Sequence, residues 1–168
     1  MTTDPARWRL CKSMMFGTAF GLVLLTASSA FAQLAEKKVI TLAAARKIMA
    51  AAEAEAERNH WAAVIAVVDD DGLPIVIERM DHAAVVAGVE LAPGKARAAA
   101  LFKKPSGDLE DAINGGRIAA TTARGFVEMQ GALPIIVDGE VIGAIGVSAD
   151  TKDHDVQIAR AGVAALKR

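Results

Sequence analysis

The chain has 168 residues, with 19 basic and 20 acidic side chains and a formal net charge of −1. This charge argues against a nucleic-acid partner, and residues 33–168 contain only Trp61, Phe102 and Phe126 as aromatic side chains, too few for a base-stacking platform. The single cysteine, Cys11, leaves residues 33–168 without thiols, which excludes disulfides, covalent attachment of c-type haem and thiolate-bound metals there.

Residues 1–32 are predicted to be a cleavable signal peptide. Three basic residues precede an apolar run over 14–27, and Ala30-Phe31-Ala32 fits a signal-peptidase site. The alternative is an uncleaved membrane anchor, but a spanning helix needs ~20 apolar residues and this run is shorter and interrupted by glycine and threonine. We therefore expect residues 33–168 to form a single domain, periplasmic or secreted, without a stable membrane anchor after cleavage.

The first predicted elements are a helix and a hairpin. Thr41 is a suitable N-cap for a helix over 42–58, whose apolar residues recur at helical spacing. Strands are predicted at 64–68 and 73–80, joined by Asp71-Gly72, because Asp-Gly tolerates the positive φ angles of a tight turn. Both strands are almost continuously apolar, which indicates burial on both faces of the sheet by helices.

The middle of the chain is predicted to be helical. Pro93 fits the first turn of a helix that runs to about Lys103 and is stopped by Pro105. Ser106 is a suitable cap for a short helix over 108–113. A short strand is expected at 126–129.

A second hairpin, with strands at 133–137 and 141–148, repeats the Asp-Gly turn, and a last helix runs to about Leu166. The order is α-β-β-α-α-β-β-β-α. Strands joined by two-residue turns are antiparallel, so the predicted fold class is α+β rather than a Rossmann sheet. Gly143 and Gly146 lie inside the last strand, where they permit close approach of a helix or, alternatively, contact with a ligand.

This arrangement resembles the GlcG/HbpS family, the haem-binding domain type also found at the C-terminus of PduO. The resemblance covers residues 38–167 and rests on VVDDDGLPIVIERMD, the helix containing Lys95-Ala96, LPIIVDGEVIGAIGVSAD and DVQIARAG. It implies a profilin-like fold, with a five-stranded antiparallel sheet flanked by helices, and homo-oligomers. It also implies non-covalent haem binding, in haem sequestration or in redox or iron sensing.

The chain departs from the family at two positions: His82 stands where relatives usually carry glycine, and Leu73 stands where many carry histidine. His82 follows a strand, in a loop of the kind that often carries sites, and is the candidate axial ligand of haem iron. The alternative is a loop histidine that merely replaces glycine. His60 and His154 are expected at a helix end and on the surface.

Other candidate haem contacts rest on the chemistry of propionates and on the family. Arg79, Lys95 and Arg124 are candidates to receive propionates. Some relatives ligate haem through threonine, which makes Thr121 and Thr122 candidates; the alternative is that their hydroxyls bond to nearby backbone.

No catalytic motif is recognisable, because nucleophile-elbow and zinc-protease patterns are missing from the sequence. The leading prediction is therefore an exported haem-binding protein, favoured over an enzyme. The second hypothesis is an enzyme acting on a small organic acid, with Asp81, His82 and Lys95 as an acid/base site if the loop folds over the helix. The third is a ligand-free oligomeric accessory protein.

Overall fold

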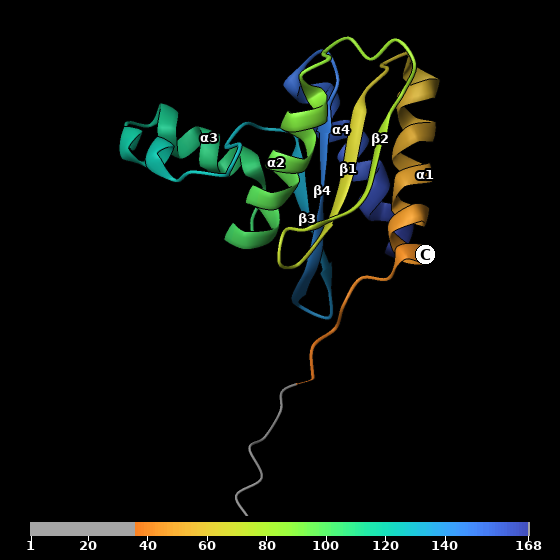
Figure 1. Cartoon of the computed structure of the whole chain (residues 1–168), viewed down its shortest axis with the longest axis horizontal. Helices are drawn as coiled ribbons and strands as arrows, with labels where there is room; N and C mark the ends of the chain where they lie inside the picture. The colour runs from red at the N-terminus through yellow and green to blue at the C-terminus, as the bar shows by residue number, and fades with distance from the viewer. Residues whose placement is uncertain (1–35, 168) are drawn as a thin grey trace, which may run out of the picture. The chain divides into compact units, whose positions relative to one another are not determined.

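The computed structural model describes residues 36–167, so the predicted signal peptide lies outside the described residues. Within them, four helices and four strands form a layered α+β fold (Figure 1). In chain order they are α1 (Leu42–Asn59), β1 (Val64–Asp69), β2 (Pro74–Arg79), α2 (Gly88–Phe102), α3 (Ser106–Asn114), β3 (Ala132–Val137), β4 (Glu140–Ser148) and α4 (Lys152–Ala164), with short 3₁₀ helices η1 (Ile118–Thr122) and η2 (Ala165–Lys167). The strands lie in the order β2-β1-β4-β3, and every neighbouring pair is antiparallel.

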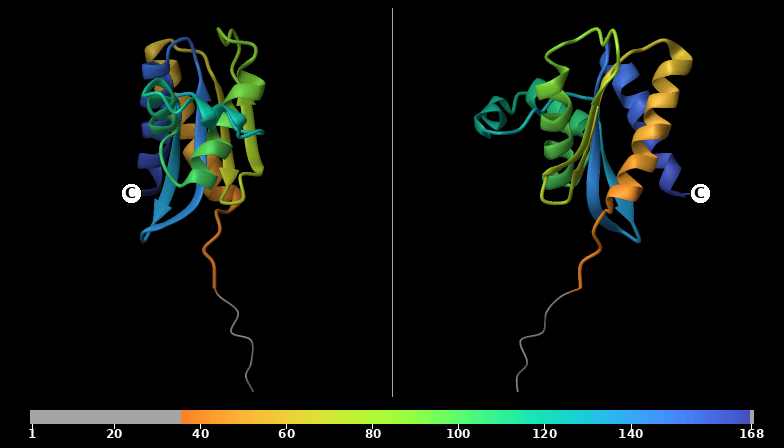
Figure 2. Two further views of the ribbon diagram at one scale, coloured as in Figure 1. Left: turned by 90° about the vertical axis from the view of Figure 1, so that its left-hand side faces the viewer. Right: turned by 45° about the vertical axis from the view of Figure 1, so that its right-hand side comes forward.

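The sheet is covered on both faces, by α1 and α4 on one side and by α2 on the other (Figure 2). Successive residues of a strand point to opposite faces, and the two faces of this sheet differ in side-chain size. Ile65 and Val67 of β1 pack in the core beneath α1 and α4. Toward α2 the sheet presents mainly small side chains, such as Ala66 and Ala144. All five residues 64–68 are buried, as the apolar run predicts.

Gly146 explains how α2 approaches the sheet so closely. A Cβ atom at this position would overlap the carbonyl oxygen of Ala92 and lie 2.7 Å from the backbone nitrogen of Ala96. The close-packing interpretation of this glycine is therefore confirmed.

Both predicted hairpins are confirmed. In the β3–β4 turn, Asp138 and Gly139 have φ values of 50° and 83°, the two positive angles of a type I′ turn. In the β1–β2 turn, Gly72 has a φ of 75°, and the Asp69 carboxylate accepts hydrogen bonds from the backbone N–H groups of Asp71 and Leu73.

The predicted strand at 126–129 is wrong, and the sheet has four strands instead of five. The Val127 N–H donates to the carbonyl oxygen of Gly94 in α2, at 3.3 Å. This segment therefore lies against a helix and adds no strand to the sheet. The expectation that both strands of the first hairpin are covered on both faces is also wrong for β2, which is a largely exposed edge strand.

Two predicted helix starts are wrong as well. Helix α2 begins at Gly88, so Pro93 lies inside it; the preceding loop supplies carbonyl acceptors for the first N–H groups, including Val85 for Gly88. Ser106 is the first residue of α3 and does not cap it, because its buried hydroxyl accepts a hydrogen bond from the Ala132 N–H at 2.9 Å. Among residues 36–167, no helix has the length and apolar character needed to cross a bilayer.

Candidate functional site

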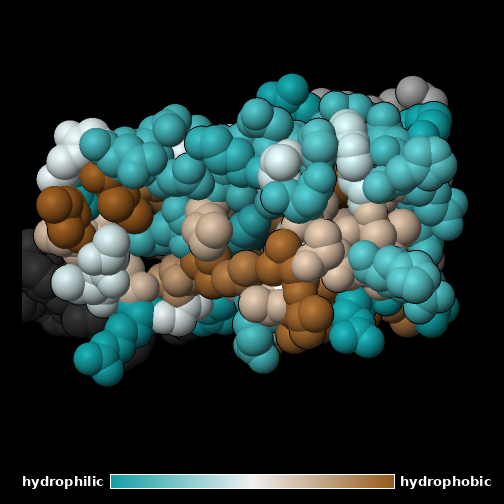
Figure 3. Space-filling model, turned by 90° about the horizontal axis from the view of Figure 1, so that it is seen from above, coloured by the Kyte–Doolittle hydropathy of each residue, from teal (hydrophilic) through white to brown (hydrophobic). Residues whose placement is uncertain are grey.

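A cleft of about 230 Å³ opens where α2, α3 and the β4–α4 junction meet. Hydrophobic side chains gather along this end of the molecule between hydrophilic flanks (Figure 3). Its lining residues are Val85, Leu91, Lys95, Glu110, Met129, Gln130, Ser148, Ala149, Asp150, Thr151, Lys152 and Asp155. The cleft therefore combines apolar walls with a dense set of polar groups.

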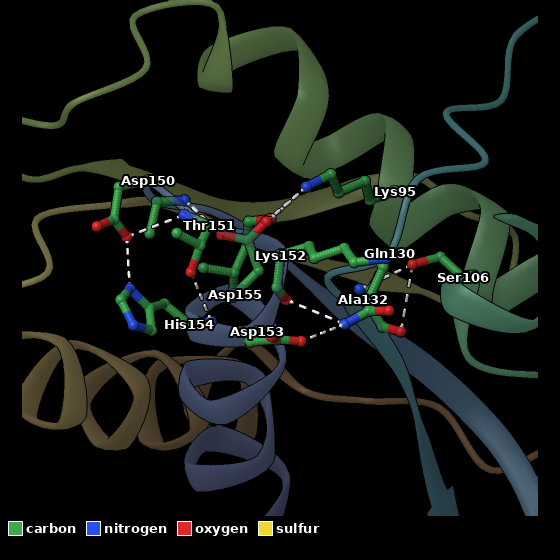
Figure 4. A network of polar contacts seen from close by, with 12 residues as sticks. Lys95, Ser106, Gln130, Ala132, Asp150, Thr151, Lys152, Asp153, His154 and Asp155 are labelled. Carbon is green, nitrogen blue, oxygen red and sulfur yellow. Dashed lines mark hydrogen bonds and ion pairs between the residues drawn. The ribbon is translucent and has the colours of Figure 1, made fainter.

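The floor of the cleft holds an ion pair between Lys95 and Asp155 (Figure 4). The Lys95 ammonium donates to Asp155 Oδ2 at 2.7 Å and to the Val147 carbonyl oxygen at 3.1 Å. The other carboxylate oxygen of Asp155 accepts from the Ala149 N–H at 2.6 Å. Burial raises the pKa of Asp155, although Lys95 and the Ala149 N–H oppose that rise.

A second set of polar contacts forms the rim and ties α3 to α4. Glu110 accepts hydrogen bonds from the Gln130 N–H at 2.6 Å and from Lys152 Nζ at 3.1 Å. The Gln130 N–H is the main reason that the pKa of Glu110 lies below its ordinary value. The Gln130 side chain in turn donates to the Lys152 carbonyl oxygen and to Asp153, as Figure 4 shows.

His154 connects the start of α4 to the segment between α1 and β1. Its Nδ1 lies 2.7 Å from Asp150 Oδ1, and its ring stacks on Trp61 with centroids 3.6 Å apart. The hydrogen bond to His154 lowers the pKa of Asp150. The expected surface histidine is thus a packed and hydrogen-bonded one.

A second hollow of about 350 Å³ adjoins the cleft and shares Glu110 and Met129 with it. Ile113 and Phe126 supply apolar wall, and Thr121 lines it too. Met129 is 49% exposed.

The structure separates the predicted site residues. Arg79 is exposed at the end of β2, and His82 is exposed just beyond it. In the described part of the chain, neither residue lines the cleft or the hollow. The φ of His82 is 63°, a left-handed conformation that favours glycine. Asp81 is likewise outside the cleft, whereas Lys95 lines it in its pair with Asp155. The three residues of the acid/base hypothesis are therefore not assembled.

The threonine candidates lie on the η1 side of the hollow. Thr121 and Thr122 donate to the carbonyl oxygens of Ile118 and Ala119, each at 2.8 Å. This is the local backbone bonding that was the alternative to haem ligation for these hydroxyls. Thr121 lines the hollow, and Arg124 is exposed just after η1.

The sequence interpretation missed Asp155, Glu110 and Ser148 as parts of the cleft. Asp155 carried a usable signal, because it shares the buried stripe of α4 with Ile158, Ala159 and Gly162 at helical spacing. A charged residue on an apolar stripe needs a buried partner. Glu110 and Ser148 carried no comparable local signal.

Residues 40–164 match the model of the family described as "Haem degrading protein HbpS-like". Protein GlcG of Escherichia coli strain K12 is 39% identical over 112 residues, which are 67% of this chain and 83% of GlcG.

Two solved structures have similar folds. A double mutant of HbpS from Streptomyces reticuli superposes with a TM-score of 0.75 at 29% identity, covering 83% of this chain and 94% of that one. The protein of a PduOC:heme complex gives a TM-score of 0.70 at 26% identity, covering 76% and 95%.

Proposed function

The chain belongs to the HbpS-like family, and from this premise we propose that it binds haem non-covalently. The observation that carries the proposal is the similarity to the PduOC chain solved with haem, over 95% of that chain, together with a partly apolar hollow lined by Met129 and Thr121. Residues 33–168 contain no cysteine, so the covalent attachment typical of c-type haem is excluded there.

Several residues of the hollow suit a haem group, whereas its two carboxylates, Glu110 and Glu128, would oppose the propionates. A haem site needs apolar wall, an axial donor and cations for the propionates. Ile113 and Phe126 supply apolar wall, and the Met129 sulfur and the Thr121 hydroxyl are donors on the same hollow. Arg124 follows η1 and is exposed to receive a propionate. When bound, haem would supply a redox-active iron.

His82 remains a second candidate axial ligand. It is exposed in the loop that leads from β2 to α2, and Val85 of the same loop lines the cleft. An imidazole presented on a loop of this kind is chemically suited to iron. The proposal therefore has two alternative donor sets, which mutagenesis distinguishes.

Titration of the purified protein with hemin tests the proposal. A Soret band that saturates at a definite stoichiometry supports it, and a flat, non-saturating absorbance overturns it. Three single variants, Met129→Leu, Thr121→Val and His82→Gly, identify the donor. The variant that removes the axial ligand should change the absorption spectrum of the haem complex.

His60→Gly is the matched control for His82→Gly. Both histidines are exposed and have nearly equal positive φ, 60° and 63°, so both substitutions remove an imidazole and suit the backbone. A spectral change in His82→Gly that His60→Gly lacks assigns the ligand to His82.

We further propose that the protein is exported, by cleavage before Gln33, and serves in haem sequestration or in redox or iron sensing as a homo-oligomer. The apolar run and small-residue site in residues 1–32 support export. Intact-mass measurement of the protein from the periplasm or medium should give a chain that begins at Gln33. A full-length mass confined to the cytoplasm would contradict export.

A further inference from the structure

The cleft beneath the rim presents hydrogen-bond donors that have no partner among residues 36–167. Lys95 is 2% exposed, and its ammonium uses two of three N–H groups, on Asp155 and on the Val147 carbonyl oxygen. Ser148 is 3% exposed and lines the same cleft.

The Ser148 hydroxyl opens toward the cleft. Within residues 36–167 it makes no side-chain hydrogen bond, and in that part of the chain every fully buried side-chain nitrogen or oxygen is bonded. Its oxygen therefore reaches the cleft, where a bound molecule would complete its hydrogen bonding.

Each carboxylate around the cleft already accepts at least one hydrogen bond from the protein. Asp155 is bonded to Lys95 and to the Ala149 N–H, Glu110 to Lys152 and the Gln130 N–H, and Asp150 to His154. The groups without a partner are the Ser148 hydroxyl and the third N–H of Lys95, and a ligand with an acceptor oxygen would satisfy both of these donors.

The charges of the lining favour an uncharged ligand. Three carboxylates, those of Glu110, Asp150 and Asp155, face two lysines, Lys95 and Lys152. A carboxylate ligand would therefore enter a cleft with no surplus of positive charge and lie beside Asp155, which like-charge repulsion disfavours. A neutral carbonyl oxygen accepts the same hydrogen bonds without that repulsion.

We propose that this cleft binds a small uncharged carbonyl compound, with its oxygen toward Ser148 and Lys95 and its carbon chain against Val85, Leu91 and Met129. The cleft volume of about 230 Å³ equals the volume that roughly eight water molecules occupy in the liquid. This suits a short-chain ketone, aldehyde or amide. The proposed haem site in the adjoining hollow shares Glu110 and the candidate donor Met129 with the cleft, but Ser148 and Lys95 line the cleft alone, so either proposal can fail alone.

A titration of the haem-free protein with 2-butanone, followed by two-dimensional NMR, tests the proposal. We expect saturable shifts at the Ser148 and Ala149 amides and at the Met129 methyl, with a dissociation constant in the millimolar range. Butyrate, which has a chain of the same length and a negative charge, should bind at least tenfold more weakly. The absence of saturable shifts at these residues, or binding of butyrate as tight as that of 2-butanone, overturns the proposal.

Two variants identify the cleft as the site. Ser148→Ala should weaken 2-butanone binding roughly threefold to tenfold, the effect of one neutral hydrogen bond, while Thr122→Val, which removes a hydroxyl outside the cleft, should leave it unchanged. Val85→Trp places a large side chain at the cleft wall from a loop position and should abolish binding. Affinity that survives both cleft variants overturns the proposal.

Discussion

Lys95 Nζ and Asp155 Oδ2 lie 2.7 Å apart and join α2 to α4 past the end of β4, with side chains only 3% and 6% exposed. The two helices cover opposite faces of the sheet (Figure 2). Separate hydrophobic clusters pack these helices onto the sheet. The ion pair is therefore a direct polar link between the two helical layers.

Lys95→Met should destabilise the fold by about 3–5 kcal/mol, because it leaves the Asp155 carboxylate buried without its cation. Urea unfolding followed by circular dichroism measures the loss. The double variant Lys95→Met/Asp155→Asn should lose less than the sum of the two single variants, since residues in direct contact are coupled. Additive losses would contradict a direct interaction.

Gly146→Ala should destabilise the protein by about 1–3 kcal/mol or more, because the added methyl group meets the backbone of α2. Gly107→Ala is the control within α3. A Cβ atom there has only ordinary contact with Gln130, at 3.5 Å, so alanine should stabilise the helix by about 0.4–1 kcal/mol. Thermal unfolding of both variants checks the opposite signs.

The acid sensitivity of the fold should depend on Glu110. Its pKa is lowered in the folded state, so its stabilising contribution is complete above the ordinary pKa of a glutamate and is lost as pH falls below it. Glu110→Gln should therefore flatten the decline in unfolding free energy between about pH 5 and pH 3. Lys152→Met should retain most of that decline, because the Gln130 N–H is the larger cause of the shift. An unchanged slope in Glu110→Gln would contradict this assignment.

His154→Ala should expose one face of Trp61, whose indole stacks on the imidazole with the planes 9° apart. We expect a red-shifted tryptophan emission, faster quenching by acrylamide and a stability loss of about 0.5–1.5 kcal/mol beyond the lost buried area. Trp61 is the only tryptophan in residues 33–168, so the signal is unambiguous once residues 1–32 are removed. His60→Ala, next to Trp61 in sequence but outside the stack, should leave the emission maximum in place.

The sequence was sufficient for those parts of the fold that local chemistry determines. The sequences at Gly72 and at Asp138-Gly139 predict both hairpins, because few other residues accept the positive φ angles of these turns. The strand expected at 126–129 failed for the opposite reason. The partner of the Val127 N–H is the Gly94 carbonyl oxygen, 33 residues earlier in the chain, and no local pattern reports such a contact.

The candidate site was predicted only in fragments, because its residues come from separate elements. Lys95 lies on the buried stripe of α2 with Ala92, Ala96 and Ala99, and Asp155 lies on the corresponding stripe of α4. Each stripe could be read from spacing alone. Their pairing could not, because it depends on how the two helices cross the sheet.

The contact of α2 with the sheet through alanines and Gly146 has an evolutionary consequence. At Gly146 the helix lies directly against the backbone of the sheet, so the contact there with Ala92 and Ala96 leaves no room for a larger side chain. Changes in ligand preference that spare this contact are open to the 83–87 loop and the 118–129 segment, which contribute residues to the cleft and the hollow. The architecture can thus persist while these two segments acquire new chemistry.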